Sequence, residues 1–278
     1  MLSQLGSEAK LLAGGQSLVP LMKLRFANPE HLVDLNFVPG ASYVREDGGS
    51  LRFGALTCHA DIEHSELAAK TPILHDCAAG IADVQIRNRG TIGGSVAEAD
   101  PSGDWGAVLL TLPVQVHCLG PQGSRTVPIS EFFLDAYTTA LQPSELISEI
   151  SVQTPPPGSG GCYLAFKRTA PVYASASAAV QLTMEDDTVR HAAIVLGAVG
   201  LLPIKATEAE AALKGEGISR ETVNAAAEAV RAAADPQPDM RGSADYKRAL
   251  VAALTKQALE VAARRARGER VEVSHLYA

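Results

Sequence analysis

The chain of 278 residues is 46% hydrophobic and 20% charged, and its formal net charge at pH 7 is -7. This composition is typical of a globular protein with room for two domains. The negative net charge excludes a general nucleic-acid-binding surface, which needs clustered Lys and Arg. No apolar run approaches the roughly 20 residues that span a bilayer, and no basic segment followed by an apolar one opens the chain. We therefore expect a cytoplasmic protein without a membrane span.

The cysteines are scattered and form no CxxC pair, which argues against a disulfide framework and an iron–sulfur site. We expect buried thiols at Cys58, Cys77, Cys118 and Cys162. One short region gathers possible zinc ligands, namely Cys58, His59, His64, His75 and Cys77. Their spacing is not that of a zinc site, so ordinary core and surface positions are favoured.

A strand at Lys10–Ala13 is predicted to lead into the glycine segment AGGQS, Ala13 to Ser17, and a short amphipathic helix to leave it from Leu18. The helix N-terminus then faces the segment and places partial positive charge beside a bound phosphate, while Gln16 and Ser17 add side-chain donors. That Ser17 caps the helix is an alternative compatible with this role.

Short helices and strands follow without a regular βαβ repeat. We expect a strand at 31–35, a hairpin at 43–54, a helix capped by Thr57, a helix from Pro72 to about Ala79, a helix at 105–112, a hairpin at 114–128 and a strand at 145–152. Such a mixture predicts an α+β fold in place of a doubly wound sheet.

The second glycine segment lies within RNRGTIGGSVAEADPSGD, Arg87 to Asp104. Because Gly93 and Gly94 lack a Cβ, we expect the backbone there to adopt positive φ and to point N–H groups at a ligand. Paired glycines are more often simple tight turns, but two such segments together suit a pyrophosphate. Asp104 is interpreted either as a helix cap or as a ligand contact.

The stretch TPPPGSGG, Thr154 to Gly161, is predicted to be a linker that cannot pack. It separates residues 1–156, with subdomains of about 1–36 and 37–156, from residues 160–278. Beyond it we expect an antiparallel sheet of three strands, at 162–168, 174–183 and 189–199, covered on one side by alanine-rich helices at 207–213, 219–234 and 243–267. A basic run at the last helix end is interpreted as solvated in preference to a subunit contact: Arg264, Arg265, Arg267 and Arg270.

The two glycine segments resemble those of the FAD-binding medium subunit of the molybdenum hydroxylases, the xanthine dehydrogenase superfamily, and most closely the aerobic carbon monoxide dehydrogenase type. The resemblance continues through AFKR at 165–168, LGAVG at 196–200, ATEAEAAL at 206–213 and RGSADYKRAL at 241–250. It implies a two-part FAD-binding domain of the PCMH/vanillyl-alcohol oxidase type, followed by a domain like the C-terminal domain of carbon monoxide dehydrogenase flavoproteins.

Two places depart from the family pattern. Ala170-Pro171-Val172 stands where relatives more often carry a glycine and an acid. The family also usually has a further strand and most of a helix ahead of the position of Met1, and Ser3 to Glu8 corresponds to the end of that helix. A late start and a real truncation are both left open.

By the resemblance, FAD would bind non-covalently at a cleft between the two domains. The backbone of two segments would contact its pyrophosphate and neighbouring groups: Ala13, Gly14, Gly15, Gln16 and Ser17, and Thr91, Ile92, Gly93, Gly94 and Ser95. Asp104 would lie near the adenosine part, Lys167 near the flavin and Tyr173 beside the flavin ring. A solvated strand residue is the alternative for Lys167, and a tyrosine packed at a strand end is the alternative for Tyr173.

No Ser–His–Asp arrangement, metal-ligand set or carboxylate pair marks a catalytic centre, so the chemistry would come from the flavin. The resemblance implies a large subunit whose molybdenum cofactor oxidises the substrate and a small subunit whose two 2Fe–2S clusters pass electrons to FAD, in a dimer of heterotrimers. The substrate of the whole enzyme and the external acceptor are not specified by this chain. A self-sufficient FAD-dependent oxidoreductase is one alternative. The other is a non-redox subunit that has lost its cofactor, against which the intact glycine segments argue.

Overall fold

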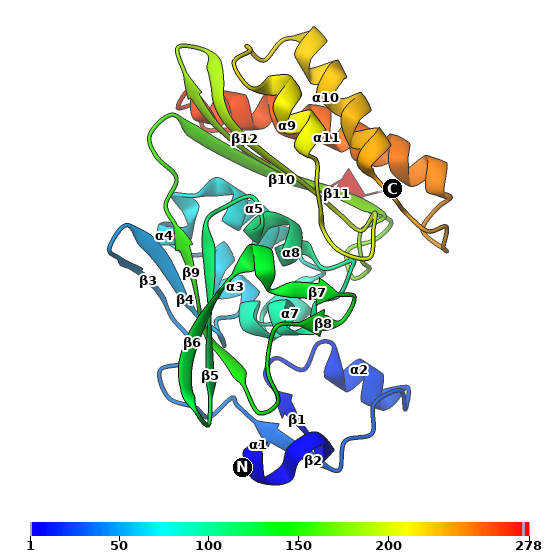
Figure 1. Cartoon of the computed structure of the whole chain (residues 1–278). Helices are drawn as coiled ribbons and strands as arrows, with labels where there is room; N and C mark the ends of the chain where they lie inside the picture. The colour runs from blue at the N-terminus through cyan, green and yellow to red at the C-terminus, as the bar shows by residue number, and fades with distance from the viewer. Residues whose placement is uncertain (1, 274–275, 278) are drawn as a thin grey trace.

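The computed structural model describes residues 2–273 and 276–277 (Figure 1). The chain begins with a small lobe at the lower end of Figure 1, in which two strands pair in parallel. Its elements are α1 (Leu2–Leu5), η1 (Gly6–Glu8), β1 (Ala9–Leu12), α2 (Leu18–Lys23) and β2 (His31–Asp34). Among residues 2–40, Ala9 and Gly14 are the buried positions. The lobe therefore has almost no core of its own.

A five-stranded antiparallel sheet forms the next part, in the order β3-β4-β9-β5-β6. Its strands are β3 (Val44–Asp47), β4 (Ser50–Gly54), β5 (Val114–Gly120), β6 (Gly123–Pro128) and β9 (Leu146–Gln153). Both predicted hairpins are present. The turn between β3 and β4 has Gly48 and Gly49 at φ +58° and +77°, a conformation that glycine adopts without steric cost.

Helices and a small hairpin pack on one face of this sheet. They are α3 (His59–Glu63), α4 (Glu66–Ala69), α5 (Pro72–Gly80), α6 (Val84–Arg87), α7 (Ile92–Glu98), α8 (Asp104–Leu109), η2 (Ile129–Glu131), β7 (Phe133–Asp135) and β8 (Thr138–Thr139). The prediction that Thr57 caps a helix is wrong. Its hydroxyl bonds the backbone of Tyr43 instead, and Cys58 occupies the cap position of α3.

The C-terminal half is a second sheet, in the order β13-β12-β11-β10-β14. Its strands are β10 (Ser159–Lys167), β11 (Ala176–Glu185), β12 (Thr188–Gly197), β13 (Ile204–Lys205) and β14 (Leu276–Tyr277). The three predicted strands are its long antiparallel members. The short edge strands β13 and β14 were not predicted, since two residues carry no recognisable pattern.

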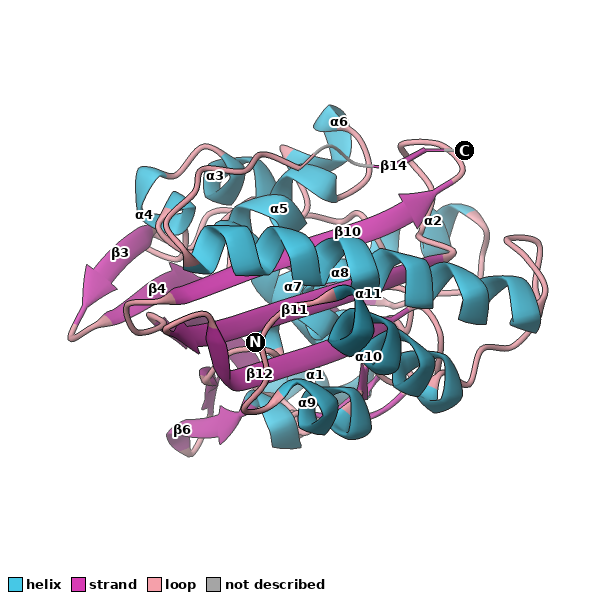
Figure 2. Cartoon of the chain, turned by 90° about the horizontal axis from the view of Figure 1, so that it is seen from above, coloured by secondary structure: helices cyan, strands magenta, loops and turns pink. Residues whose placement is uncertain are grey.

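Three helices cover one face of this sheet (Figure 2). They are α9 (Thr207–Leu213), α10 (Arg220–Ala233) and α11 (Ala244–Ala266). The hydroxyls of Ser219 and Ser243 accept hydrogen bonds from the backbone N–H groups of Thr222 and Tyr246, so each serine caps the helix that follows it. These helices follow the predicted ranges closely because serine caps and alanine-rich periodicity are local signals.

The opposite face of the same sheet packs on the N-terminal half. Along β10, Cys162 and Leu164 join the core under the helices, whereas Tyr163 and Ala165 join the core of the first sheet. This alternation follows from the period of two in a strand. The sheet is therefore buried on both faces and belongs to two cores at once.

The stretch predicted to be an unpacked linker is partly wrong, because β10 already begins at Ser159. A Cβ at Gly160 would lie 2.1 Å from the carbonyl oxygen of Ala262. The glycines that looked like a loose linker instead allow α11 to approach the strand closely.

The basic run at the end of α11 is likewise not simply solvated. The side chain of Arg265 is only 7% exposed, with Nη1 2.5 Å and Nη2 3.0 Å from the two carboxylate oxygens of Asp76 on α5. It also donates to the carbonyls of Gly161 and Val271. A two-pronged, buried ion pair thus ties the last helix to the N-terminal half. Within the described ranges, no helix has the length and apolarity needed to cross a membrane.

Candidate functional site

The two glycine segments, about 80 residues apart in sequence, touch each other. A Cβ added to Gly14 would lie 2.0 Å from the carbonyl oxygen of Arg89 and 2.8 Å from the Cα of Gly90. A Cβ at Gly94 would lie 3.8 Å from the Cβ of Ala13. The structure therefore brings the segments into direct contact, and glycine at position 14 is what permits it.

The first segment has the features of an anion cradle. The backbone N–H groups of residues 14–17 have no acceptor among the residues that the structure describes. Gly15 adopts φ +74°, and Asn36 holds the segment by donating from Nδ2 to the carbonyl of Ala13 at 3.0 Å. Free successive N–H groups around a left-handed glycine suit a phosphate oxygen.

The side chains of this segment are engaged differently from their backbone. Gln16 donates from Nε2 to the carbonyl of Gly14 at 3.2 Å, which stiffens the turn. Ser17 occupies the cap position of α2, but its hydroxyl makes no cap hydrogen bond. The hydroxyl of Ser17 is therefore not committed to the helix.

The second segment differs from its prediction, because Gly93 and Gly94 lie in the first turn of α7 and neither has a positive φ. The N–H of Ile92 donates to Thr57, that of Gly93 to Ala55, and that of Gly94 to the hydroxyl of the cap residue Thr91. The expectation of a turn that points free N–H groups at a ligand is wrong here.

Packing explains the glycines of this segment instead. A Cβ at Gly93 would lie 2.6 Å from both the Cβ and the carbonyl oxygen of Ala55, at the end of β4. At Gly94 the nearest atom would be the Thr91 hydroxyl, at 2.8 Å. Gly93 therefore lets α7 sit against the sheet, and Gly94 leaves room for the cap and for the first segment.

Asp104 and Lys167 are brought together in the interior, at 7% and 1% exposure. Lys167 donates from Nζ to the carbonyl of Gly80 at 2.6 Å and lies 3.4 Å from Oδ1 of Asp104. The hydroxyl of Tyr163 donates to the same carboxylate at 2.6 Å. Lys167 is thus not a solvated strand residue, and the cap of α8 is Gly103, not Asp104. Their assignment as cofactor contacts stays a prediction.

Tyr173 lies at the seam between the two halves, with 45% of its surface exposed. Burial and the adjacent carboxylate of Asp100 raise the pKa of its phenol well above the ordinary value. Burial, and after it the charge of Asp100, raises the pKa of Tyr137 as well. Sequence reasoning missed Asp100 and Tyr137. A local signal existed for the former, since Asp100 lies within the second glycine stretch, but none existed for the latter.

Of the residues weighed as zinc ligands, His59 has another partner in the interior. His59 is buried, and its Nδ1 accepts a hydrogen bond from Nε1 of Trp105 at 3.1 Å. Burial lowers the pKa of His59 to about 4, so the ring is neutral. Among the described residues, the grouping with ligand atoms close enough for a metal is Glu8, Glu30 and His31, which are all exposed.

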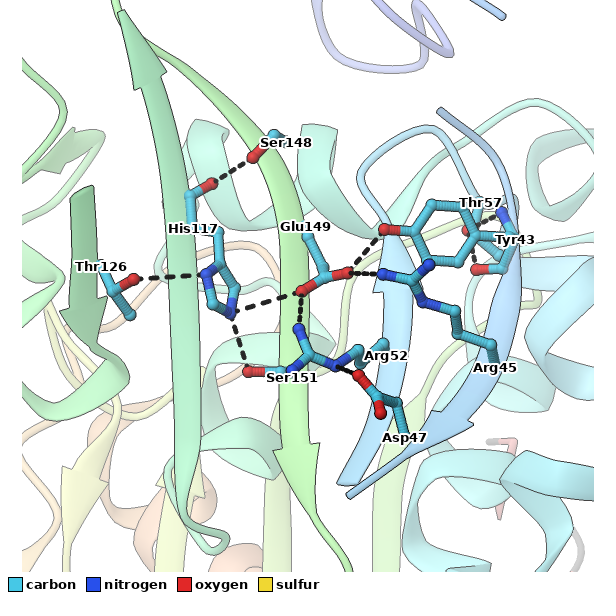
Figure 3. A network of polar contacts seen from close by, with 10 residues as sticks. All are labelled: Tyr43, Arg45, Asp47, Arg52, Thr57, His117, Thr126, Ser148, Glu149 and Ser151. Atoms are coloured by element: carbon cyan, nitrogen blue, oxygen red, sulfur yellow. Dashed lines mark hydrogen bonds and ion pairs between the residues drawn. The ribbon is translucent and has the colours of Figure 1, made fainter. Parts of the chain in front are cut away.

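A separate polar network covers the outer face of the first sheet (Figure 3). Glu149 accepts hydrogen bonds from the Tyr43 hydroxyl at 2.6 Å, from Arg52 at 2.6 Å and from Arg45 at 3.0 Å. Burial opposes ionisation, but the hydrogen bonds from Tyr43 and Arg52 lower the pKa of Glu149 overall. With its carboxylate enclosed by three donors, the network joins strands and offers no open binding site.

Two family descriptions match the chain. "FAD binding domain in molybdopterin dehydrogenase" matches residues 1–155, and "CO dehydrogenase flavoprotein C-terminal domain" matches residues 161–262. The carbon monoxide dehydrogenase medium chain of Hydrogenophaga pseudoflava is 43% identical over 265 residues, covering 94% of this chain and 92% of that one. The nicotine 6-hydroxylase medium subunit of Paenarthrobacter nicotinovorans is 37% identical, covering 91% and 89%.

Solved structures agree. A carbon monoxide dehydrogenase from Hydrogenophaga pseudoflava, lacking the Mo-pyranopterin moiety of its molybdenum cofactor, matches with a TM-score of 0.92 and 44% identity over 95% of this chain and 92% of that chain. Quinoline 2-oxidoreductase from Pseudomonas putida 86 matches with a TM-score of 0.88 and 32% identity, covering 93% and 90%. The α+β fold with its two-part architecture is thereby confirmed. The chain belongs to the family of FAD-binding subunits of molybdopterin dehydrogenases, in its carbon monoxide dehydrogenase and xanthine dehydrogenase branch of oxidoreductases.

Proposed function

We propose that the chain is the FAD-binding electron-transfer subunit of a molybdenum-containing hydroxylase or dehydrogenase. The observation that carries the proposal is the contact between two glycine segments, one of which presents backbone N–H groups at residues 14–17 that have no acceptor in the described part of the chain. In a chain that belongs to a FAD-binding family, such a cradle fits the diphosphate of FAD. When bound, FAD supplies the redox chemistry.

The two glycine segments hold different sides of the cofactor. The N–H groups of residues 14–17 bind the diphosphate, with Ser17 as an additional donor. Across from them, Thr91 to Ser95 form the opposite wall, which α7 fixes through its packing on Ala55. At this wall FAD would contact the surface of α7, because the N–H groups in the first turn of α7 already donate to acceptors within the chain.

Three further residues complete the proposed site. Asp104 and Lys167 are assigned to the adenosine and flavin regions by the resemblance, and their mutual contact joins α8 to β10 across the two halves. Tyr173 is assigned a place beside the flavin ring, where an aromatic side chain covers one face and controls access of an electron acceptor. Its partial exposure at the seam supports this role.

We further propose that the division falls at residues 1–156 and 160–278, and that the chain works with a large molybdenum subunit and a small subunit that carries two 2Fe–2S clusters. Several relatives are named as medium chains or subunits, which supports partner chains. In this scheme electrons pass from the clusters through FAD to an external acceptor. A dimer of heterotrimers in the cytoplasm is the expected assembly.

Absorbance spectra of the purified chain test the cofactor. We expect flavin absorbance bands and release of FAD on denaturation, because no His or Cys lies where a covalent flavin link is expected by the resemblance. A folded protein that takes up no flavin from an excess of FAD would contradict the proposal.

Purification from the native host tests the assembly. Molybdenum, iron and two further chains are expected to co-purify at a stoichiometric ratio, with a mass in size-exclusion chromatography that gives the number of heterotrimers. If the isolated chain with FAD oxidises a substrate by itself, the self-sufficient oxidoreductase is the correct reading and the subunit proposal is overturned.

A further inference from the structure

The side chain of His59 lies next to the contact between the two glycine segments. A Cβ at Gly14 would lie 2.8 Å from the Cα of Gly90. A Cβ at Gly90 would in turn lie 2.9 Å from Nε2 and 3.0 Å from Cδ2 of His59. Both glycines are buried. The backbone of Gly90 therefore contacts the first glycine segment and also the imidazole ring of His59.

The imidazole ring of His59 is held from the other side. His59 is the first residue of α3, is 4% exposed and donates its backbone N–H to the carbonyl of Gly90 at 3.0 Å. Its Nδ1 accepts from Nε1 of the buried Trp105 on α8 at 3.1 Å. Because Nδ1 accepts, the single proton of the neutral ring is on Nε2, at the edge that meets Gly90. The ring thus connects α8 to the second glycine segment.

The residue before His59 holds the same stretch of backbone. Cys58 forms an isolated antiparallel bridge with Thr91, and its Sγ donates to the carbonyl oxygen of Arg89 at 3.9 Å. That oxygen is the atom that a Cβ at Gly14 would meet at 2.0 Å. The start of α3 therefore supports the part of the second segment that touches the first.

The first segment depends on this support because its lobe is almost without a core. Among residues 2–40, Ala9 and Gly14 are the buried positions. Gly14 is therefore the buried point at which the anion cradle rests on the remainder of the protein. Groups that bind a ligand must be held to within about 0.5 Å of their productive positions. A shift of Gly90 would move the N–H groups of residues 14–17.

We propose that His59 is a positioning residue for the FAD diphosphate. Its ring, anchored on Trp105, supports the backbone of Gly90 and thereby sets the position of the N–H groups at residues 14–17. His59 acts through Gly90 and does not touch the cofactor. This inference rests on the proposed function.

Two substitutions separate the two ends of the ring. His59→Asn keeps an oxygen near the place of Nδ1 for Trp105 but removes the edge that meets Gly90. His59→Gln places its amide near the place of Nε2 and leaves Nε1 of Trp105 without an acceptor. His191→Asn is the control, because His191 is an exposed histidine on β12. The full chain is freed of FAD and titrated with it, and thermal unfolding is measured without FAD.

The two variants of His59 should change different quantities. In His59→Asn the dissociation constant for FAD should rise about tenfold, while thermal unfolding stays close to that of the parent. In His59→Gln the unfolding temperature should fall, because a buried donor is left unpaired, while the dissociation constant rises less than about threefold. Phosphorus NMR of bound FAD should show shifted diphosphate resonances in His59→Asn and not in His191→Asn.

A double variant tests whether His59 acts through Gly90. Gly90 lacks a positive φ, so Gly90→Ala brings no backbone strain, but its methyl group meets the imidazole ring. In the His59→Asn background that edge of the ring is gone and the methyl group occupies its space. The double variant should therefore bind FAD more tightly than either single variant, and at least about threefold more tightly than Gly90→Ala.

Three results would overturn the role of His59. One is a dissociation constant that follows the loss of stability in both His59 variants, as a merely structural residue would give. Another is an unchanged diphosphate spectrum in His59→Asn, and the third is additive effects in the double variant. A parent protein that binds no FAD would instead contradict the proposed function itself.

Discussion

The two glycine segments look alike in sequence but differ in what their glycines do. Gly15 adopts the left-handed conformation in a loop whose N–H groups at residues 14–17 have no acceptor within the described ranges, whereas Gly93 and Gly94 lie in a helix whose first N–H groups have acceptors. One segment supplies hydrogen-bond donors, and the other lets its own helix, α7, pack closely against the sheet. A glycine pair therefore says where backbone comes close, but not whether it approaches a ligand or another part of the protein.

The largest effect is expected where the segments meet. Gly14→Ala places a methyl group 2.0 Å from the Arg89 carbonyl oxygen, so the segments must separate and FAD retention should be lost, with about 3 kcal/mol of stability. Flavin content and thermal unfolding of the purified protein measure both. Gly40→Ala is the control, because Gly40 has φ +69° but open space around it and should cost only about 1 kcal/mol. Equal flavin content in the two variants would contradict the contact.

Lowering the pH should reduce the free energy of unfolding through His59, which contacts the second glycine segment. His59 donates its backbone N–H to the Gly90 carbonyl, and burial holds its pKa near 4, below the 6.5 of the unfolded chain. The unfolded state therefore binds the proton first, and stability should fall by roughly 3 kcal/mol as pH drops from 6.5 to 4. Denaturant unfolding at several pH values measures this. His59→Asn keeps an acceptor for Trp105 and should have a shallower slope; parallel slopes would refute the assignment.

Gly93→Ala is expected to damage folding more directly than binding. Its methyl group would lie 2.6 Å from Ala55, which should cost about 2 kcal/mol and lower the melting temperature. At temperatures where the variant remains folded, the affinity for FAD should fall less than in Gly14→Ala. A variant of parental stability that has lost FAD would reverse the distinction between the two segments.

The smallest effect is expected at the helix cap of the second segment. Thr91→Val removes the acceptor of the Gly94 N–H and should cost about 1 kcal/mol. Thr91→Ser keeps the hydroxyl and should be close to the parent in denaturant unfolding. If flavin affinity rises in Thr91→Val, the freed Gly94 N–H binds the cofactor. The Thr91 hydroxyl and the ligand would then compete for this donor.

Sequence patterns predicted what depends on neighbouring residues. Serine caps, hairpin turns and alanine-rich helices fall close to their expected places because each is specified within a few residues. Burial of Lys167 and pairing of Arg265 with Asp76 depend on partners more than 60 residues away, which no local pattern encodes. The resemblance implied that both glycine segments serve one site, whereas their direct contact at Gly14 needed the positions of residues about 80 apart in the chain.

The second sheet, with Tyr163 in one core and Leu164 in the other, limits how the protein can be rearranged. The C-terminal half of the protein cannot be exchanged as an independent domain, although a separate family description covers residues 161–262. A chimaera that took this half from a relative would need the matching surface of α5 and α8 as well, including Asp76 for Arg265. Homologous recombination between such genes should therefore yield folded products most often when the crossover preserves that pairing of surfaces. Sequence drift on one side of the sheet should be accompanied by compensating change on the other.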